Sequence, residues 1–152
     1  MCGILYYNSK EKLENKFFAD ALETLNHRGP DNSNYQSFSG NEVFLGHTRL
    51  KIIDLQNRAN QPFTSKCKRY SLIFNGEIYN FKNLKKKFNL SSSTSSDTEV
   101  LLECFLLFKE DFTKYIDGMF VGVIYDKLKK ITYVFRDLNG IKPLLIYKSN
   151  NK

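Results

Sequence analysis

The stretch MFVGVIYDKLKKITYVF (residues 119–135) contains two runs of strand-forming residues separated by a polar turn. Val, Ile, Tyr and Phe dominate both runs, and the turn, KLKK, is rich in lysine. Two strands joined by so short a turn run antiparallel, because a parallel connection needs a crossover of about a dozen residues or more. The stretch therefore predicts an antiparallel β-sheet.

Other strand-like runs occur in groups, with helix-like segments between the groups. Strands and helices do not alternate regularly, so the pattern does not favour a parallel βαβ sheet. It indicates instead an α+β fold in layers, with mainly antiparallel sheets. The further strand-like runs are residues 3–7, 43–53 with a break near Gly46, 69–77 and 143–148.

Three helices are expected from the spacing of apolar residues. On the first, Phe17 and Leu22 belong to one apolar stripe, and Gly29 is the expected end, because glycine is common just after a helix. The third is expected to begin with a capping box, in which Ser96 and Glu99 bond to each other's backbone. The expected helices cover residues 15–29, 80–88 and 97–111.

The composition is typical of a folded chain without a membrane anchor. The 152 residues are enough for one domain with a core, and 41% of them are hydrophobic. No apolar run approaches the roughly 20 residues that span a bilayer, and the first residues lack the pattern of a signal peptide, so we expect a cytoplasmic protein. The three cysteines form no CxxC pair and only two histidines are present, which indicates neither a disulfide framework nor a metal site.

The net charge of +7 is concentrated in lysine-rich clusters. Such clusters can contact phosphate backbones, but no aromatic residues are interleaved with them as in an RNA-binding signature. We interpret the clusters as solvated surface and do not expect a nucleic acid partner. They are residues 66–69, 82–87 and 127–130.

Cys2 directly follows the initiator methionine. Removal of Met1 would give Cys2 a free α-amine in addition to its thiol. The amine, with a pKa of about 7.7 to 8.0, is suited to take a proton from a thiol whose pKa is about 8.5. The two groups could therefore act as base and nucleophile, as in catalysis by an N-terminal threonine.

Other side chains could supply what such a nucleophile needs. Attack on an amide requires donors for the oxyanion, and Asn75 with the backbone of Gly76 could provide them at a strand end. If the amide belongs to a free amino acid, Arg49 could bind its carboxylate, and Glu77 and Asp97 its ammonium group. Each has a plainer interpretation: Asn-Gly is a common turn, Arg49 a surface cation, and Asp97 a residue that favours a helix N-terminus.

Three further reactive side chains are interpreted as structural. His47 could pair with the Cys2 thiol, but we do not favour it as the base. Cys104 lies on the apolar face of an expected helix and is assigned to the core. Cys67 lies among basic residues that could lower its thiol pKa, yet no neighbour in the sequence suggests catalysis.

Eight segments of the chain, in order and at similar spacing, resemble the glutamine-hydrolysing domain of class II glutamine amidotransferases, and most of all its asparagine synthetase branch. The resemblance extends from about Met1 to Tyr147. It implies an N-terminal-nucleophile hydrolase fold, a four-layer αββα sandwich with two antiparallel sheets. The segments are MCGI, LNHRGPD, GHTRLKIIDL, NQPF, LIFNGEIYN, SSDTEVLL, YIDGMFVGVIYD and RDLNGIKPL.

The resemblance also implies a reaction and a role for each site residue. Cys2 would be the nucleophile, with its freed amine as base, and glutamine would be hydrolysed to glutamate and ammonia through a γ-glutamyl thioester. Asn75 and Gly76 would form the oxyanion hole, and backbone groups near Leu50 and Ile52 would complete the pocket. The remaining substrate contacts would come from Arg49 to the carboxylate and from Glu77 and Asp97 to the amino group.

The chain departs from the family after the segment GIKPL. Family members continue into further strands and a large synthetase domain that binds ATP and aspartate. Residues 1–152 are therefore expected to form a glutamine amidotransferase type 2 domain that lacks its last strands, which would leave a sheet edge exposed. No GxxxxGK phosphate loop is present, so we expect no cofactor in this chain, with ATP and magnesium on a separate synthetase domain.

Two functions remain open from the sequence. The first is the glutaminase half of an asparagine-synthetase-like amidotransferase, which passes ammonia to a synthetase partner. The second is a non-catalytic, truncated module that binds such a partner or, less readily, nucleic acid. The candidate partners are a synthetase subunit and a second copy of the chain. A self-processing peptidase is a weaker alternative, because only Met1 precedes Cys2.

Overall fold

The computed structural model describes residues 2–149. The first sheet has the order β1-β3-β2 and consists of β1 (Gly3–Asn8), β2 (Asn32–Phe38) and β3 (Val43–Arg49). The second has the order β4-β5-β6-β7 and consists of β4 (Phe63–Thr64), β5 (Tyr70–Ile78), β6 (Gly118–Asp126) and β7 (Ile131–Arg136). The α-helices are α1 (Asn15–Glu23), α2 (Phe81–Lys87) and α3 (Asp97–Phe108), and short 3-10 helices lie at Asn26–Arg28, Asn57–Ala59 and Lys109–Lys114.

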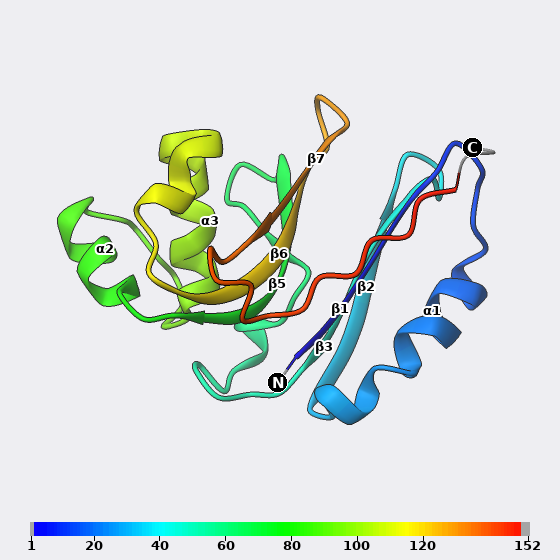
Figure 1. Ribbon diagram of the computed structural model, residues 1–152, viewed down its shortest axis with the longest axis horizontal. Helices are drawn as coiled ribbons and strands as arrows, with labels where there is room; N and C mark the ends of the chain where they lie inside the picture. Colours follow the sequence, from blue (N-terminus) through cyan, green and yellow to red (C-terminus); the bar gives the residue numbers. More distant parts are fainter. Residues whose placement is uncertain (1, 150–152) are drawn as a thin grey trace.

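The two sheets pack face to face, with helices on both outer faces (Figure 1). Helix α1 covers the first sheet, whereas α2 and α3 cover the second. The strands pair antiparallel throughout both sheets. The expected α+β class and the four-layer αββα sandwich are therefore confirmed.

Three apolar clusters fill the spaces between the four layers. Successive side chains of β5 alternate between two of them: Ile73 lies between the sheets, and Leu72 and Phe74 lie toward α2 and α3. Phe105 of α3 is fully buried in the same cluster as Leu72, and Phe18 of α1 is buried against the first sheet. Burial of side chains of this size stabilises the fold by roughly 1.5–3 kcal/mol each. The layered arrangement follows from sheets that are apolar on both faces.

The hairpin predicted for residues 119–135 forms as β6 and β7, with Val123 opposite Val134. The run at 43–53 differs from its prediction, because β3 passes unbroken through Gly46 and ends at Arg49. A Cβ atom on Gly46 would lie 2.8 Å from Cε1 of a phenylalanine on α1. Glycine therefore allows the helix to approach the sheet closely and does not break the strand.

The prediction for the first helix is wrong in two respects. Phe17 is 61% exposed, and Phe18 takes the buried position beside Leu22. The α-helix also ends at Glu23 and continues only as a 3-10 turn. Gly29 is not a left-handed helix cap, since its φ is −152°. A Cβ atom there would lie 2.4 Å from the carbonyl group of a β3 residue, so close packing against the sheet explains this glycine.

Residues 143–148 are extended but join neither sheet within the described part of the chain, so the strand predicted there is not observed. Leu145 and Tyr147 are 95% and 92% exposed. The segment is the red trace that crosses the first sheet in the view of Figure 1. Its apolar residues suggested a strand, but none of the described layers covers the side chains of Leu145 and Tyr147, and Pro143 has no N–H to donate.

Only half of the predicted capping box forms at the start of α3. Ser96 accepts a hydrogen bond from the N–H of Thr98 at 3.2 Å, as an N-cap should. Glu99 instead accepts bonds from the N–H groups of Ser93 and Thr94, at 2.9 and 2.7 Å, and from their hydroxyls. The carboxylate thus orders the serine-rich segment before the helix. None of the helices in residues 2–149 is both long and apolar enough to cross a membrane.

Candidate active site

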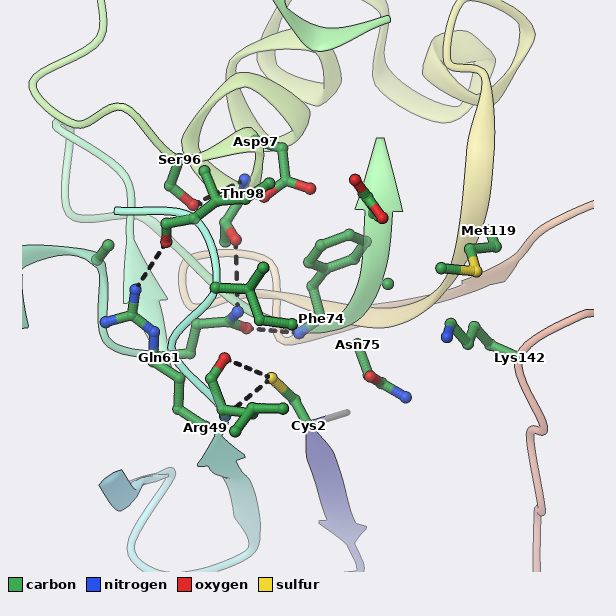
Figure 2. Close-up of a pocket in the computed structure, with 16 residues that line it drawn as sticks. Cys2, Arg49, Gln61, Phe74, Asn75, Ser96, Asp97, Thr98, Met119 and Lys142 are labelled. Atoms are coloured by element: carbon green, nitrogen blue, oxygen red, sulfur yellow. Dashed lines mark hydrogen bonds between the residues drawn. The ribbon is translucent and has the colours of Figure 1, made fainter. Parts of the chain in front are cut away.

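One pocket, with a volume of about 110 Å³, lies where the start of β1 and the ends of β3 and β5 meet the start of α3 (Figure 2). The structure brings together every site residue named from the sequence: Cys2, Arg49, Leu50, Ile52, Asn75, Gly76, Glu77 and Asp97. The pocket is also lined by residues that the sequence did not assign to it, which are Ile53, Ala59, Gln61, Phe74, Ser96, Thr98, Met119 and Lys142.

The sulfur of Cys2 is half-buried and fixed by the residue that follows β3. The N–H of Leu50 donates to Sγ at 3.4 Å, and the thiol approaches the Leu50 carbonyl oxygen at 3.8 Å. The backbone is held as well, because the Cys2 carbonyl accepts from Nε of Arg28 at 3.3 Å and the N–H of Gly3 donates to Thr48 Oγ1 at 3.1 Å. Met1, whose removal would free the amine, lies outside the described residues.

Asn75 and Gly76 lie near the end of β5, on a part of the strand that extends beyond its short neighbour β4. In an antiparallel ladder, alternate residues direct both backbone groups away from a given partner strand. Along the edge of β5 that faces away from β6, the N–H groups of Phe74 and Ile78 donate to side chains, at 2.6 and 3.0 Å. The same alternation places the N–H of Gly76 between them on this edge, facing the pocket.

Position 76 has room only for glycine in this backbone conformation. A Cβ atom on Gly76 would lie 2.2 Å from the carbonyl oxygen of Met119. The side chain of Asn75 is 6% exposed and lies in the pocket with Cys2 (Figure 2). The strand therefore presents a side-chain amide and a backbone N–H side by side, as an oxyanion hole requires.

Arg49 is 5% exposed and organises the loop that follows β3. Two N–H groups of one terminal nitrogen donate to the carbonyl of Gln56 and to Oδ1 of Asn60, at 3.0 and 2.6 Å. The other terminal nitrogen donates to the carbonyls of Ile53, at 3.2 Å, and of Asp54. Burial lowers the pKa of the Arg49 guanidinium. Four of its five N–H donors thus shape the pocket wall.

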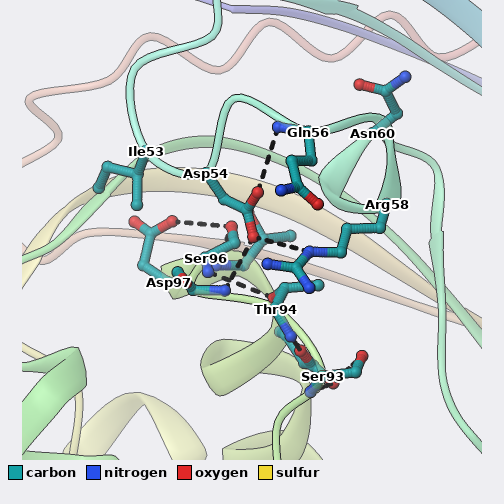
Figure 3. A network of polar contacts seen from close by, with 12 residues as sticks. Ile53, Asp54, Gln56, Arg58, Asn60, Ser93, Thr94, Ser96 and Asp97 are labelled. Carbon is teal, nitrogen blue, oxygen red and sulfur yellow. Dashed lines mark hydrogen bonds and ion pairs between the residues drawn. The ribbon is translucent and has the colours of Figure 1, made fainter.

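Asp54 joins this loop to the serine-rich segment before α3 (Figure 3). Its carboxylate accepts from the N–H of Ser95 at 2.8 Å and from the N–H of Gln56 at 3.2 Å, and forms an ion pair with Arg58 at 3.3 Å. The bond from Ser95 holds the pKa of the Asp54 carboxyl below its ordinary value. Two segments that line the pocket are therefore fastened to each other.

Asp97 places a carboxyl group in the pocket, on α3 and away from Cys2 (Figure 2). It is 5% exposed, and the N–H of Ile78 donates to it at 3.0 Å. Burial raises the pKa of this carboxyl, despite the backbone N–H groups that bond to it, and nearby Glu77 raises it further. Among the described residues Asp97 has no salt-bridge partner. A cation from a ligand would supply the missing charge.

Lys142 reaches the pocket from the turn after β7. The carboxylate of Asp137 accepts from the N–H groups of Phe120, Ile141 and Lys142, at 3.1, 2.7 and 3.1 Å, which fixes this turn. Lys142 is 4% exposed, and Figure 2 shows its side chain directed into the pocket near Asn75. The sequence assigned Lys142 no role in the site, although the residue lies in the family-like segment RDLNGIKPL.

The residues interpreted as structural lie outside the pocket. His47 is fully buried, its Nε2 lies 3.2 Å from the carbonyl oxygen of Phe74, and burial lowers its pKa to about 3. Cys104 is buried in the core, and burial raises its thiol pKa to about 11. Cys67 is exposed. In residues 2–149 no three His, Cys, Asp or Glu side chains are grouped so that they could hold a metal ion.

Comparison with known proteins gives one consistent result. The model of the glutamine amidotransferase domain matches residues 1–152. A probable glutamine-hydrolysing asparagine synthetase of Acanthamoeba polyphaga mimivirus is 40% identical over 149 residues, which are 95% of this chain and 27% of the relative. Glutamine-hydrolysing asparagine synthetase 1 of Bacillus subtilis is 35% identical over 160 residues, covering 100% of this chain and 25% of the relative. The chain thus spans about a quarter of the length of these relatives.

Proposed function

The chain belongs to the glutamine amidotransferase domain family, and we propose that its pocket hydrolyses L-glutamine to L-glutamate and ammonia. The observation that carries the proposal is the content of one small pocket: a half-buried thiol, an amide and a backbone N–H at a strand end, and a buried carboxyl that has no salt-bridge partner within residues 2–149. An α-amino acid with a side-chain amide would satisfy each of these groups.

Charge complementarity defines how glutamine would lie. Its ammonium group would pair with Asp97, with the exposed Glu77 as a second carboxylate. Its α-carboxylate would meet the positive charge of Arg49, at the remaining Nε–H or in place of a loop carbonyl. Backbone groups near Leu50 and Ile52 would complete this end of the pocket. The side-chain amide then extends toward Cys2.

The reaction would proceed in two balanced halves once Met1 is removed. The free amine of Cys2 takes the thiol proton, and the thiolate attacks the amide carbon of glutamine while Asn75 and Gly76 donate to the oxyanion. The C–N bond breaks, the amine returns its proton to the departing nitrogen, and ammonia leaves. A γ-glutamyl thioester remains on Cys2. The amine then takes a proton from water, the hydroxide attacks the thioester, and glutamate and the thiol are released.

The named relatives suggest where the ammonia would go. They are glutamine-hydrolysing asparagine synthetases, and the matched region is a minor part of each. We propose that the ammonia released from glutamine at Cys2 passes to an ATP-dependent synthetase partner. That partner, and not residues 1–152, would bind ATP and magnesium.

The test uses purified protein whose first residue is established by mass spectrometry. Glutamate release is measured with the chain alone and with a synthetase partner, and 6-diazo-5-oxo-norleucine is used as a glutamine-like electrophile. The processed chain should release glutamate and take up one adduct on Cys2, Cys2→Ala should do neither, and Cys67→Ala should match the wild type. If the processed chain is inactive and unlabelled in both settings, the proposal is wrong and the non-catalytic module is favoured.

A further inference from the structure

Side chains hold both backbone groups of Phe74, the residue immediately before the oxyanion donors. Its N–H donates to Oε1 of Gln61 at 2.6 Å, and its carbonyl lies 3.2 Å from Nε2 of His47. Gln61, Phe74 and His47 are all buried. The two peptide groups of β5 on either side of the Phe74 Cα are therefore clamped by side chains from two other parts of the chain.

The clamp exists because β4 is too short to continue the ladder. Strand β4 pairs only Phe63 with Leu72 and Thr64 with Ser71. One residue earlier stands Pro62, which has no N–H to donate to a sheet. Beyond this point no strand within residues 2–149 pairs with this edge of β5, and the amide of Gln61 bonds to it instead.

Gln61 also connects the two ends of the pocket. Since the N–H of Phe74 is a donor, the Gln61 atom that faces it must be the amide oxygen, which directs the amide nitrogen toward Oγ1 of Thr98, at 3.4 Å. Thr98 directly follows Asp97 at the start of α3. One buried amide thus links the strand of the oxyanion donors to the helix of the ammonium-binding carboxylate.

His47 completes the clamp from β3. A carbonyl oxygen only accepts, so Nε2 must carry the proton and Nδ1 must be bare. Nδ1 has no hydrogen-bond partner among the described residues. No titratable side chain of the described residues is hydrogen-bonded to the ring, and Arg49 is the charged group that acts on it. The neutral ring therefore acts as a fixed donor to the strand.

We propose that Gln61 and His47 are positioning residues of the oxyanion hole, an inference that rests on the proposed glutaminase function. They act through the two peptide groups that flank Phe74, the second of which contains the N–H of Asn75. The next N–H on the same edge belongs to Gly76, and the one after it, of Ile78, is held by Asp97 at 3.0 Å. With both neighbours held, Asn75 and Gly76 stay where a developing oxyanion needs them. Release of Phe74 would let this end of the strand shift.

Gln61→Met removes the acceptor while it keeps the volume and length of the side chain, and His47→Leu removes the donor. Both should lower kcat by about 10- to 100-fold with KM for glutamine changed less than about threefold, because misplaced donors affect the transition state more than substrate binding. His47→Gln keeps a donor and should recover most of kcat. Gln36→Met is the matched control, since Gln36 bonds a serine side chain of β5 at 3.0 Å and does not line the pocket.

A second measurement is independent of catalysis. Amide hydrogen exchange of Phe74 should accelerate in Gln61→Met, while Ile78, which depends on Asp97, keeps its wild-type rate. If Gln61→Met does not fold, Gln61→Asn serves instead, because its shorter side chain cannot reach Phe74.

The outcomes separate the two proposals. A wild-type chain that is processed but inactive, alone and with a partner, overturns the glutaminase function. An active wild type with an unchanged kcat in the Gln61 variants, or with a loss confined to KM, overturns the positioning role. An unchanged exchange rate of Phe74 shows that the clamp does not hold the strand and overturns it too.

Discussion

Asp97→Asn is the sharpest single test of how the pocket would bind its substrate. The substitution keeps the shape of the side chain and an oxygen for the N–H of Ile78, but it removes the negative charge. Asp97 is 5% exposed, whereas Glu77 is exposed to solvent, so we expect most of the attraction for an ammonium group to come from Asp97.

Loss of one charge from a buried ammonium–carboxylate pair weakens the binding free energy by about 2 to 3 kcal/mol. At 1.4 kcal/mol for each factor of ten, KM for glutamine should rise about 30- to 150-fold. The assay measures glutamate release from glutamine and from glutaramic acid, which lacks the α-amino group. The wild type should strongly prefer glutamine, and Asp97→Asn should lose that preference.

The same variant should be more stable than the wild type. Burial raises the pKa of the Asp97 carboxyl in the folded chain. A carboxyl group whose pKa is higher in the folded than in the unfolded chain adds to the free energy of unfolding at a pH below its unfolded-state pKa. That contribution is lost as the pH rises through its folded-state pKa. Where the pH lies above the folded pKa, the carboxylate, which has no salt-bridge partner in the described part of the chain, destabilises the protein without ligand, and Asp97→Asn should raise Tm there.

Two results would refute this reasoning. One is a KM for glutamine within about twofold of the wild-type value, since a buried charge pair is worth more than that. The other is an equal loss of activity toward glutamine and glutaramic acid, which would place the effect of Asp97 somewhere other than at the amino group.

Three further predictions concern residues outside the pocket. Cys67 should react with iodoacetamide long before Cys104, which peptide mapping can check. A hydrogen bond with a neighbouring serine lowers the pKa of the exposed Cys67 thiol, whereas burial raises the pKa of the Cys104 thiol to about 11. Asp126→Asn should lower the free energy of unfolding by about 2 kcal/mol at pH 7, as measured by urea unfolding. Hydrogen bonds from Arg69 hold the Asp126 pKa at about 2, below 3.8, so this stabilisation is present above pH 4 and should vanish as pH falls toward 2. Gly46→Ala should lower the free energy of unfolding by about 1–3 kcal/mol by pressing on α1, and an unchanged Tm would contradict that.

Local patterns predicted most of the elements correctly, and the errors share a cause. The run 69–77 became a strand because its apolar residues fill both adjoining layers. Phe17 and Phe18 are equally apolar neighbours, and only the packing of α1 on the first sheet decides which one is buried. Residues 143–148 have a strand's composition, but composition cannot supply a partner strand.

The residues of the pocket divide in the same way. Cys2, Asn75 and Asp97 carry groups whose chemistry can be recognised in the sequence, and the structure brings them to one pocket. Gln61 and Lys142 carry no such signal, because an amide and an amine are common on any surface. Their importance depends on burial and direction.

The chemical groups that are available, and the segments that alternate as strands or carry an apolar stripe, can be read from the sequence, because these properties depend on neighbouring residues. The folded chain is needed to show that the start of β1, the ends of β3 and β5, and the start of α3 meet at one place. That meeting depends on strand register and on the packing of the two sheets. Because β4 ends early, one edge of β5 is left without a paired strand of the described residues. At this edge a glutamine and a histidine from distant parts of the chain bond to the strand that carries Asn75 and Gly76.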